Sequence, residues 1–194
     1  MCDTKHARNR SKLTLNQPSE IDGVRISLAK SHSDTRGSFI KFHPGSEFEN
    51  ELDSVAVSTN LQRGTIRGLH FQVAPFAEEK LISCIQGSVF DVIVDLRPDS
   101  KTLGKWISFE LSAENSLQVY LPKGIAHGFQ TLEPNAIVHY SLGSLYSPES
   151  SYSIDPFGDL GISWPVLEFT ISERDRRGIS FPSAAKKYSE SLKR

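Results

Sequence analysis

Short β-type segments, separated by turn residues, follow one another through almost the whole middle of this chain. They recur roughly every 8–12 residues, a spacing typical of a β-sandwich or barrel and not of alternating strands and helices. In the run 89–95 the side chains alternate between two faces, with Asp91, Ile93 and Asp95 on one of them. The expected strands cover residues 24–28, 37–42, 54–59, 80–85, 88–96, 105–111, 116–121, 127–132 and 136–141. The chain is therefore expected to be all-β.

Helical signals are weak and come late in the chain. Ser172 with Asp175 three positions later has the form of a capping box, with Asp in place of Glu, and predicts the start of a short helix. Residues 112–115 are expected to form a turn. The predicted architecture is a β-barrel or sandwich with short peripheral helices.

One folded domain is expected, over residues 21–183. A chain of 194 residues can bury one substantial core and is short for two ordinary domains. Residues 1–20 are polar, carry several basic side chains and lack the apolar run of a secretory signal, so they are expected to be a flexible leader. Residues 184–194 are rich in charged and small side chains and are expected to be a loosely held tail.

Composition argues against several classes of partner. The formal net charge of −1 gives no general attraction to nucleic acid or to an anionic membrane surface. No apolar run approaches the ~20 residues of a membrane span. Cys2 and Cys84 are too few and too differently placed for a disulfide framework, so a reducing cytoplasm is the expected location.

One set of spaced polar residues points to chemistry. Gly64 and His70 are followed by Gln72, by Lys80 with six residues between it and the turn glycine Gly87, and by His127 at the end of Pro122-Lys-Gly-Ile-Ala-His. The spacing resembles the metal-binding blocks of cupins, G-x5-H-x-H, an acidic ligand before x6-G, and P-x-G-x2-H. Gln72 and Lys80 stand where two of the four ligands belong, and a Lys ammonium repels a cation. No metal is therefore expected. A His beside a fixed positive charge suits removal of a proton next to a carbonyl.

A longer series of motifs, in a fixed order along the chain, resembles the motifs of one protein family. The motifs are Arg67-Gly-Leu-His-Phe-Gln72, Lys80-Leu, the run 87–97, Leu111-Ser-Ala-Glu-Asn115, the run 122–129, Tyr140, Tyr146-Ser-Pro-Glu149 and Asp159-Leu-Gly-Ile-Ser-Trp-Pro165. From about Ile21 to Asp175 the chain resembles the dTDP-4-dehydrorhamnose 3,5-epimerase family. The resemblance implies a jelly-roll cupin without metal or cofactor, usually a homodimer. Such an enzyme inverts C3 and C5 of a nucleotide-linked 4-keto-6-deoxyhexose.

The resemblance also implies catalytic roles. His70 matches the base that removes the proton alpha to the C4 ketone, and Tyr140 matches the acid that returns a proton on the opposite face. Lys80 matches the residue that stabilises the enolate oxygen. Asp175 matches the carboxylate that pairs with the base, and Asp91 is a second candidate for that orienting role. Two groups on opposite faces are what inversion needs.

Further positions match residues that hold the substrate. Arg36 and Phe39 match positions that reach the nucleotide from the neighbouring subunit, and Arg67 resembles a phosphate or substrate contact. The remaining expected substrate-binding residues are Gln72, Asp91, His127 and Tyr146. Where relatives have a Gln-x-Asn pair that helps to hold the nucleotide, this chain has Val55-Ala-Val57, which leaves the identity of the base open.

Each residue taken singly also has a structural interpretation. A His on an inward strand face is usually a core residue, Tyr140 could be a barrel-wall aromatic, and His127 could bond only to backbone. The combined spacing favours catalysis. An enzyme acting at C3 only, or a keto-isomerase, would use the same base and acid, because substrate orientation decides which carbon is reached. Other classes are a metal-dependent cupin oxygenase, which needs further ligands, and a sugar-binding cupin without turnover, which would not need His70 or Tyr140.

Overall fold

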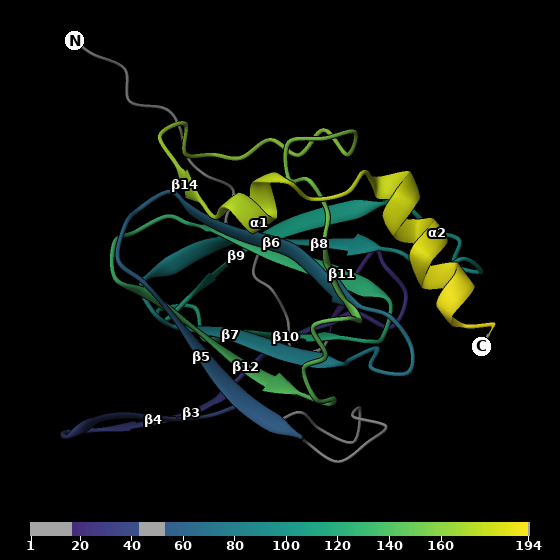
Figure 1. Cartoon of the computed structure of the whole chain (residues 1–194). Coiled ribbons are helices and arrows are strands. Elements are labelled where there is room, and N and C mark those ends of the chain that lie inside the picture. Colours follow the sequence, from purple (N-terminus) through teal and green to yellow (C-terminus); the bar gives the residue numbers. More distant parts are fainter. Residues whose placement is uncertain (1–16, 43–52, 194) are drawn as a thin grey trace, which may run out of the picture.

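A computed structural model describes residues 17–42 and 53–193 (Figure 1). Most of the expected leader, residues 1–16, lies outside the described residues, as does Cys2. The end of that segment is not a free leader, because Gln17–Pro18 forms strand β1 and pairs with Arg25–Leu28, strand β2. Folded structure thus begins slightly before the predicted boundary at residue 21.

Two antiparallel sheets face each other, one above the other in Figure 1. Sheet I has the order β1, β2, β10 (Leu117–Leu121), β7 (Lys80–Gln86), β12 (Ala136–Leu142) and β5 (Ser54–Asn60). Sheet II has the order β13 (Ser151–Ser153), β6 (Thr65–Gln72), β11 (Ile125–Thr131), β8 (Ser88–Asp95) and β9 (Trp106–Ser112), with β14 (Thr170–Ile171) parallel to β6. Strands adjacent in space are mostly distant in sequence, and this is the jelly-roll fold predicted for the chain.

The main core lies between the sheets and follows from the alternation of the strands. Ile93 of β8 and Phe129 of β11 point inward from sheet II and meet Ile82 of β7 and Val138 of β12 from sheet I, all of them buried. Burying each such side chain contributes about 1.5–3 kcal/mol. Asp91 shares the inward face of β8 with Ile93, as the sequence predicted, and so is carried into the interior.

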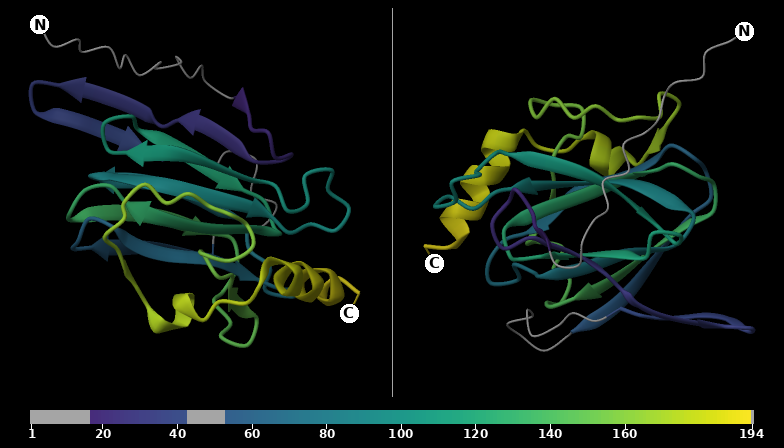
Figure 2. Two further views of the ribbon diagram at one scale, coloured as in Figure 1. Left: turned by 90° about the horizontal axis from the view of Figure 1, so that it is seen from above. Right: turned by 180° about the vertical axis from the view of Figure 1, so that it is seen from behind.

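A second core covers the outer face of sheet II. Helix α2, Phe181–Ser191, lies beside that sheet (Figure 2). Its residues Ala184 and Tyr188 pack against Val92 and Val94 of β8. The prediction of a loose tail from residue 184 is wrong. Ala184 and Tyr188, four positions apart, dock the helix together with the partly buried Phe181, although charged neighbours surround the two buried residues in the sequence.

The helix start predicted at Ser172 is confirmed, but in place of the reciprocal bond of a capping box the Asp175 carboxylate bonds to Gly68, His70 and Ser153. The Ser172 side chain accepts a hydrogen bond from the backbone N–H of Asp175, 3.1 Å away, and helix α1 spans Glu173–Arg176. Each strand predicted from the sequence is present, with ends that agree to within two residues. Strand β6, which bears the central motif, was not among them, because glycine at its centre lowers the strand signal.

One hairpin stands apart from both sheets. Strands β3, Lys30–Asp34, and β4, Gly37–Lys41, pair only with each other among the described strands, and they project beyond the barrel (Figures 1 and 2). The side chains along it are largely exposed. Neither helix in the described parts of the chain has the length and apolar character that crossing a membrane requires.

Candidate active site

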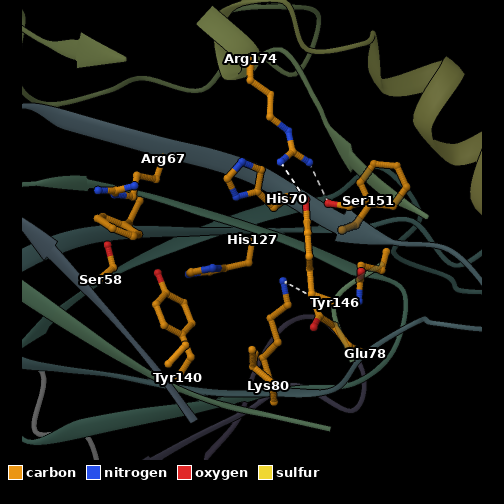
Figure 3. A pocket seen from close by; sticks show the side chains of 15 residues that line it. Ser58, Arg67, His70, Glu78, Lys80, His127, Tyr140, Tyr146, Ser151 and Arg174 are labelled. Atoms are coloured by element: carbon orange, nitrogen blue, oxygen red, sulfur yellow. Dashed lines mark hydrogen bonds and ion pairs between the residues drawn. The ribbon is translucent and has the colours of Figure 1, made fainter. Parts of the chain in front are cut away.

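A cavity of about 290 Å³ opens between the two sheets (Figure 3). Sheet II contributes His70 and His127 to its wall, and sheet I contributes Lys80 and Tyr140. Each of these residues belongs to the inward-facing set of its strand, so the strand alternation that builds the core also builds the cavity. The four residues predicted to line one pocket are therefore brought together.

A bulge in β6 decides which side chains reach the cavity. His127 of β11 pairs with His70, but Phe129 pairs with Arg67, so three steps along β6 match two along β11. Without the extra residue, Arg67 and His70 would face opposite sides of the sheet, since they are an odd number of positions apart. Gly68 lies in the bulge at φ 101°, in a region that favours glycine.

His70 is fixed by a buried carboxylate. Its Nε2 lies 2.6 Å from Oδ1 of Asp175, whose side chain is 6% exposed. Asp175 also accepts hydrogen bonds from the hydroxyl of Ser153, at 3.1 Å, and from the backbone N–H of Gly68, at 3.2 Å. Burial alone would raise the pKa of Asp175, but the hydrogen bond and charge of His70, with these two donors, bring it below its ordinary value. An ionised carboxylate at Nε2 holds the proton there and leaves Nδ1 as the basic nitrogen.

A second histidine and carboxylate pair lies deeper. Nε2 of His127 is 2.8 Å from Oδ2 of Asp91, and both side chains are buried. Burial raises the pKa of the Asp91 carboxyl, with the neighbouring His127 acting in the opposite direction. Asp91, the second candidate for orienting His70, therefore lies against the other histidine, because the bulge and helix α1 leave that place to Asp175.

Tyr140 faces the two histidines from sheet I. Its ring meets the ring of His127 edge to face, with centroids 6.1 Å apart. Burial raises the pKa of the hydroxyl well above its ordinary value, the charge of Asp91 adds to this, and Arg67 opposes it. The hydroxyl is therefore protonated at neutral pH and can donate a proton.

Lys80 is not a surface lysine. Its side chain is 8% exposed, and its Nζ lies 3.0 Å from Oε1 of Glu78, which is 11% exposed. Glu78 also lines the cavity and was not predicted from the sequence. An acidic residue two positions before a lysine that opens a buried strand was the available signal.

Basic side chains lie at the mouth of the cavity. Arg67 donates to Oδ1 of Asn60 at 2.7 Å, which holds its guanidinium against the wall. Arg174 was not predicted, and it donates to the hydroxyls of Tyr146, at 3.2 Å, and Ser151, at 2.8 Å (Figure 3). Its place next to Asp175 on helix α1 could have suggested it.

The other predicted binding residues have different positions. Gln72 lines the cavity, but its amide bonds to backbone, donating to the carbonyls of Phe76 and Leu145 and accepting from the N–H of Ser147. These hydrogen bonds connect the segments that contain Phe76 and Leu145–Ser147. Arg36 and Phe39 lie on the projecting hairpin and not among the residues that line the cavity. The Arg36 side chain is 88% exposed and paired with Asp34.

The described side chains that line the cavity do not form a cluster of metal ligands. Nowhere in the described ranges do three or more His, Cys, Asp or Glu side chains come together in a way that could hold a metal ion. Both cavity histidines already direct one ring nitrogen to a carboxylate of their own. The arrangement offers a base, a protonated hydroxyl and a buried ammonium around one space.

The geometry agrees with the comparisons to known proteins. The family model for dTDP-4-dehydrorhamnose 3,5-epimerase matches residues 18–183. The chain belongs to this family. As a member of it, the protein is an isomerase of the sugar-nucleotide epimerase type. It is 39% identical over 168 residues to the dTDP-4-dehydrorhamnose 3,5-epimerase of Sinorhizobium fredii, covering 82% of this chain and 85% of the relative.

Solved structures of this epimerase family are close in shape as well. The dTDP-6-deoxy-D-glucose-3,5-epimerase of Legionella pneumophila, in complex with dTDP-4-keto-L-rhamnose, superposes with a TM-score of 0.81 at 33% identity, covering 86% of this chain and 92% of that one. A 3'-monoepimerase from Streptomyces bikiniensis, in complex with dTDP-quinovose, gives a TM-score of 0.79 at 32% identity, covering 87% of this chain and 89% of that one.

Proposed function

We propose that this epimerase inverts C3 and C5 of a dTDP-4-keto-6-deoxyhexose. The observation that carries the proposal is the position of a base and an acid on facing sheets: His70, held by Asp175, on one side of the cavity and protonated Tyr140 on the other. A flat enolate between them meets a base on one face and a proton donor on the other. Inversion follows when the proton leaves from one face and returns to the other.

The chemistry of each step follows from the neighbours of each residue. Nδ1 of His70 removes the proton alpha to the C4 ketone, and the Asp175 carboxylate stabilises the imidazolium that forms. Negative charge then develops on the ketone oxygen. The Lys80 ammonium, already buried and fixed by Glu78, stabilises that charge without having to leave water during the reaction. Tyr140 supplies the returning proton.

The substrate class is supported by the basic mouth and by the relatives. Arg67 and Arg174 at the rim suit a diphosphate, because a guanidinium pairs with phosphate oxygens in two-point contacts. Related structures contain dTDP-linked sugars. At the position of the Gln-x-Asn pair, Val55 and Val57 point away from the cavity and only Ala56 lines it, so other residues must contact the base in this chain.

A homodimer working in the cytoplasm completes the proposal. Val55, Val57 and Phe39 are 59%, 57% and 62% exposed on edge strand β5 and on the projecting hairpin. Such a surface suits burial against a second copy. In that arrangement Arg36 and Phe39 would reach the nucleotide in the neighbouring cavity, which explains why they lie far from their own.

A second candidate is epimerisation at C3 alone. The similarity to the 3'-monoepimerase from Streptomyces bikiniensis favours it, because the two chains cover nearly 90% of each other. Both activities begin with the same base and enolate, and the tilt of the sugar decides which carbon lies within reach.

Proton NMR in D2O distinguishes these functions. The purified enzyme is incubated with dTDP-4-keto-6-deoxyglucose, and the C3 and C5 proton signals are followed over time. Loss of both signals with inversion is the expected result. Loss at C3 only would establish the monoepimerase, and no loss from folded protein would contradict the proposed reaction on this substrate.

A further inference from the structure

Among the described side chains that line the cavity, Glu78 is the one carboxylate. The other lining residues with a permanent charge are Arg67, Lys80 and Arg174, all of them basic. A diphosphate would be repelled by an acid, so a carboxylate in this wall has to face an uncharged, hydrogen-bond-donating part of the ligand.

One oxygen of the Glu78 carboxylate forms an ion pair, and the other can accept further hydrogen bonds. Oε1 lies 3.0 Å from Nζ of Lys80, and both side chains are about nine-tenths buried. No second hydrogen bond or ion pair reaches this carboxylate from the part of the chain that the structure describes. A buried carboxylate accepts several hydrogen bonds, so Oε2 is an acceptor with capacity left at the cavity wall.

The cavity has two chemically different ends. In Figure 3, Arg67 and Ser58 lie at one side and Glu78 at the other, with His70, His127 and Lys80 between them. A nucleotide sugar has the same polarity, with a charged diphosphate at one end and neutral hydroxyls at the other. The match orients the ligand, with the diphosphate toward Arg67 and Arg174 at the mouth and the hexose over Lys80 and Glu78.

We propose that Glu78 is a specificity-determining residue that accepts a hydrogen bond from a hydroxyl at C2 or C3 of the hexose. The inference deepens the proposed function and rests on it. Oε1 fixes the Lys80 ammonium, and Oε2 recognises the hydroxyl beside it. A site with a buried acceptor discriminates against a sugar that lacks the matching hydroxyl, because the acceptor is then left without a partner.

Calorimetric binding tests this without requiring turnover. The ligands are dTDP, dTDP-6-deoxyglucose, which has no ketone, and the 2-deoxy and 3-deoxy analogues of that sugar. For the wild type, removal of one of the two hydroxyls should raise Kd by about 10- to 100-fold. Glu78→Ala should bind the parent sugar and that analogue with equal, weakened affinity. Its Kd for dTDP should match that of the wild type.

Three results would overturn the assignment. The first is a wild type that binds both deoxy analogues as tightly as the parent sugar, and the second is a Glu78→Ala variant that still discriminates as the wild type does. The third is that Glu78→Ala weakens the binding of dTDP, which has no hexose, as much as the binding of the parent sugar. Glu110→Ala, at an exposed position on β9, is the matched control. Glu78→Gln, which keeps the shape, repeats the comparison if Glu78→Ala does not fold.

The binding test of Glu78 and the exchange test of the proposed reaction can fail independently of each other. If the wild type fails to exchange C3 or C5 protons yet Glu78 still discriminates the hydroxyl, the reaction is wrong and the recognition stands. If exchange occurs and discrimination is absent, the reaction stands and the role of Glu78 is wrong.

Discussion

Asp175 connects the stability of the protein to the site at the scale of a single residue. Its carboxylate holds His70, caps the bulge through the N–H of Gly68 and lies nearly buried. Its pKa is below the ordinary value, since these hydrogen bonds outweigh the burial that would raise it. A group with a lowered folded-state pKa contributes stability above its unfolded pKa and loses it as the pH falls through the folded value.

Asp175→Asn should therefore destabilise the protein by about 1–3 kcal/mol at neutral pH. The difference from wild type should shrink as the pH falls from about 5 to below the unfolded Asp value of about 4. Denaturant unfolding at a series of pH values measures it. Asp99→Asn, at an exposed position in a loop, is the control. A difference that stays constant down to the lowest pH would contradict the assigned pKa direction.

Residue spacing, together with the family resemblance that added Tyr140, revealed much of the site from the sequence. His70, Lys80, His127 and Tyr140 were predicted together and do line one cavity. The pairing of Asp91 with His127 was not predictable, because Asp91 remains a second candidate beside Asp175 for His70 until the sheet register is known. Glu78 and Arg174 were missed because a charged residue beside a known motif looks like solvated surface in a sequence.

The contact between β6 and β11 positions the site at the scale of elements. A Cβ atom on Gly128 would lie 2.6 Å from the carbonyl oxygen of Arg67 and 2.9 Å from Cδ2 of Leu69. No side chain fits there without moving β6. Since the bulge in β6 aims both Arg67 and His70, a shift of this strand should affect binding and proton removal together.

Gly128→Ala should cost about 1–3 kcal/mol of stability, the usual range for overpacking. It should also slow C–H exchange, because a shift of β6 moves both Arg67 and His70 in the cavity wall. Thermal unfolding and deuterium incorporation measure the two effects. Gly158→Ala, where a Cβ atom would make only ordinary contacts at 3.4 Å, is the control. Unchanged exchange in Gly128→Ala would show that the close approach does not position the site.

Elements differed in how well the sequence predicted them. Alternating strands such as β8 were found because their period of two persists over many residues. Strand β6 was missed because Gly68 lowers its strand signal and the bulge at this glycine interrupts the period of two, and that interruption aims Arg67 and His70 into the site. Helix α2 was missed because two buried residues, Ala184 and Tyr188, give too short a pattern in a charged segment.

At the scale of the whole molecule, the projecting hairpin predicts that two subunits share their sites. If Arg36 serves the neighbouring cavity, each site takes His70 from one chain and Arg36 from the other. Arg36→Ala and His70→Ala then remove residues that different chains supply to one site. A mixed dimer of the two variants then contains one site with both residues intact. Random assembly should restore about a quarter of wild-type activity at low substrate concentration.

Co-expression of the two variants, with activity compared against each expressed alone, checks this. Lys30→Ala on the same hairpin, paired with His70→Ala, is the control for changes that merely touch the hairpin. Activity of the mixture no higher than the average of the separate variants would mean that Arg36 acts within its own subunit, or not at all.

The central claim is that His70, on one sheet, removes the proton from the substrate and that Tyr140, on the facing sheet, returns a proton to the opposite face. Deuterium incorporation and inversion, followed by NMR in D2O for His70→Ala and Tyr140→Phe, test it most directly. We predict that His70→Ala loses both. Tyr140→Phe should keep exchange and lose inversion, since His70 alone returns the deuteron to the face it came from. Equal loss of exchange and inversion in Tyr140→Phe would contradict a division of the two steps between the sheets.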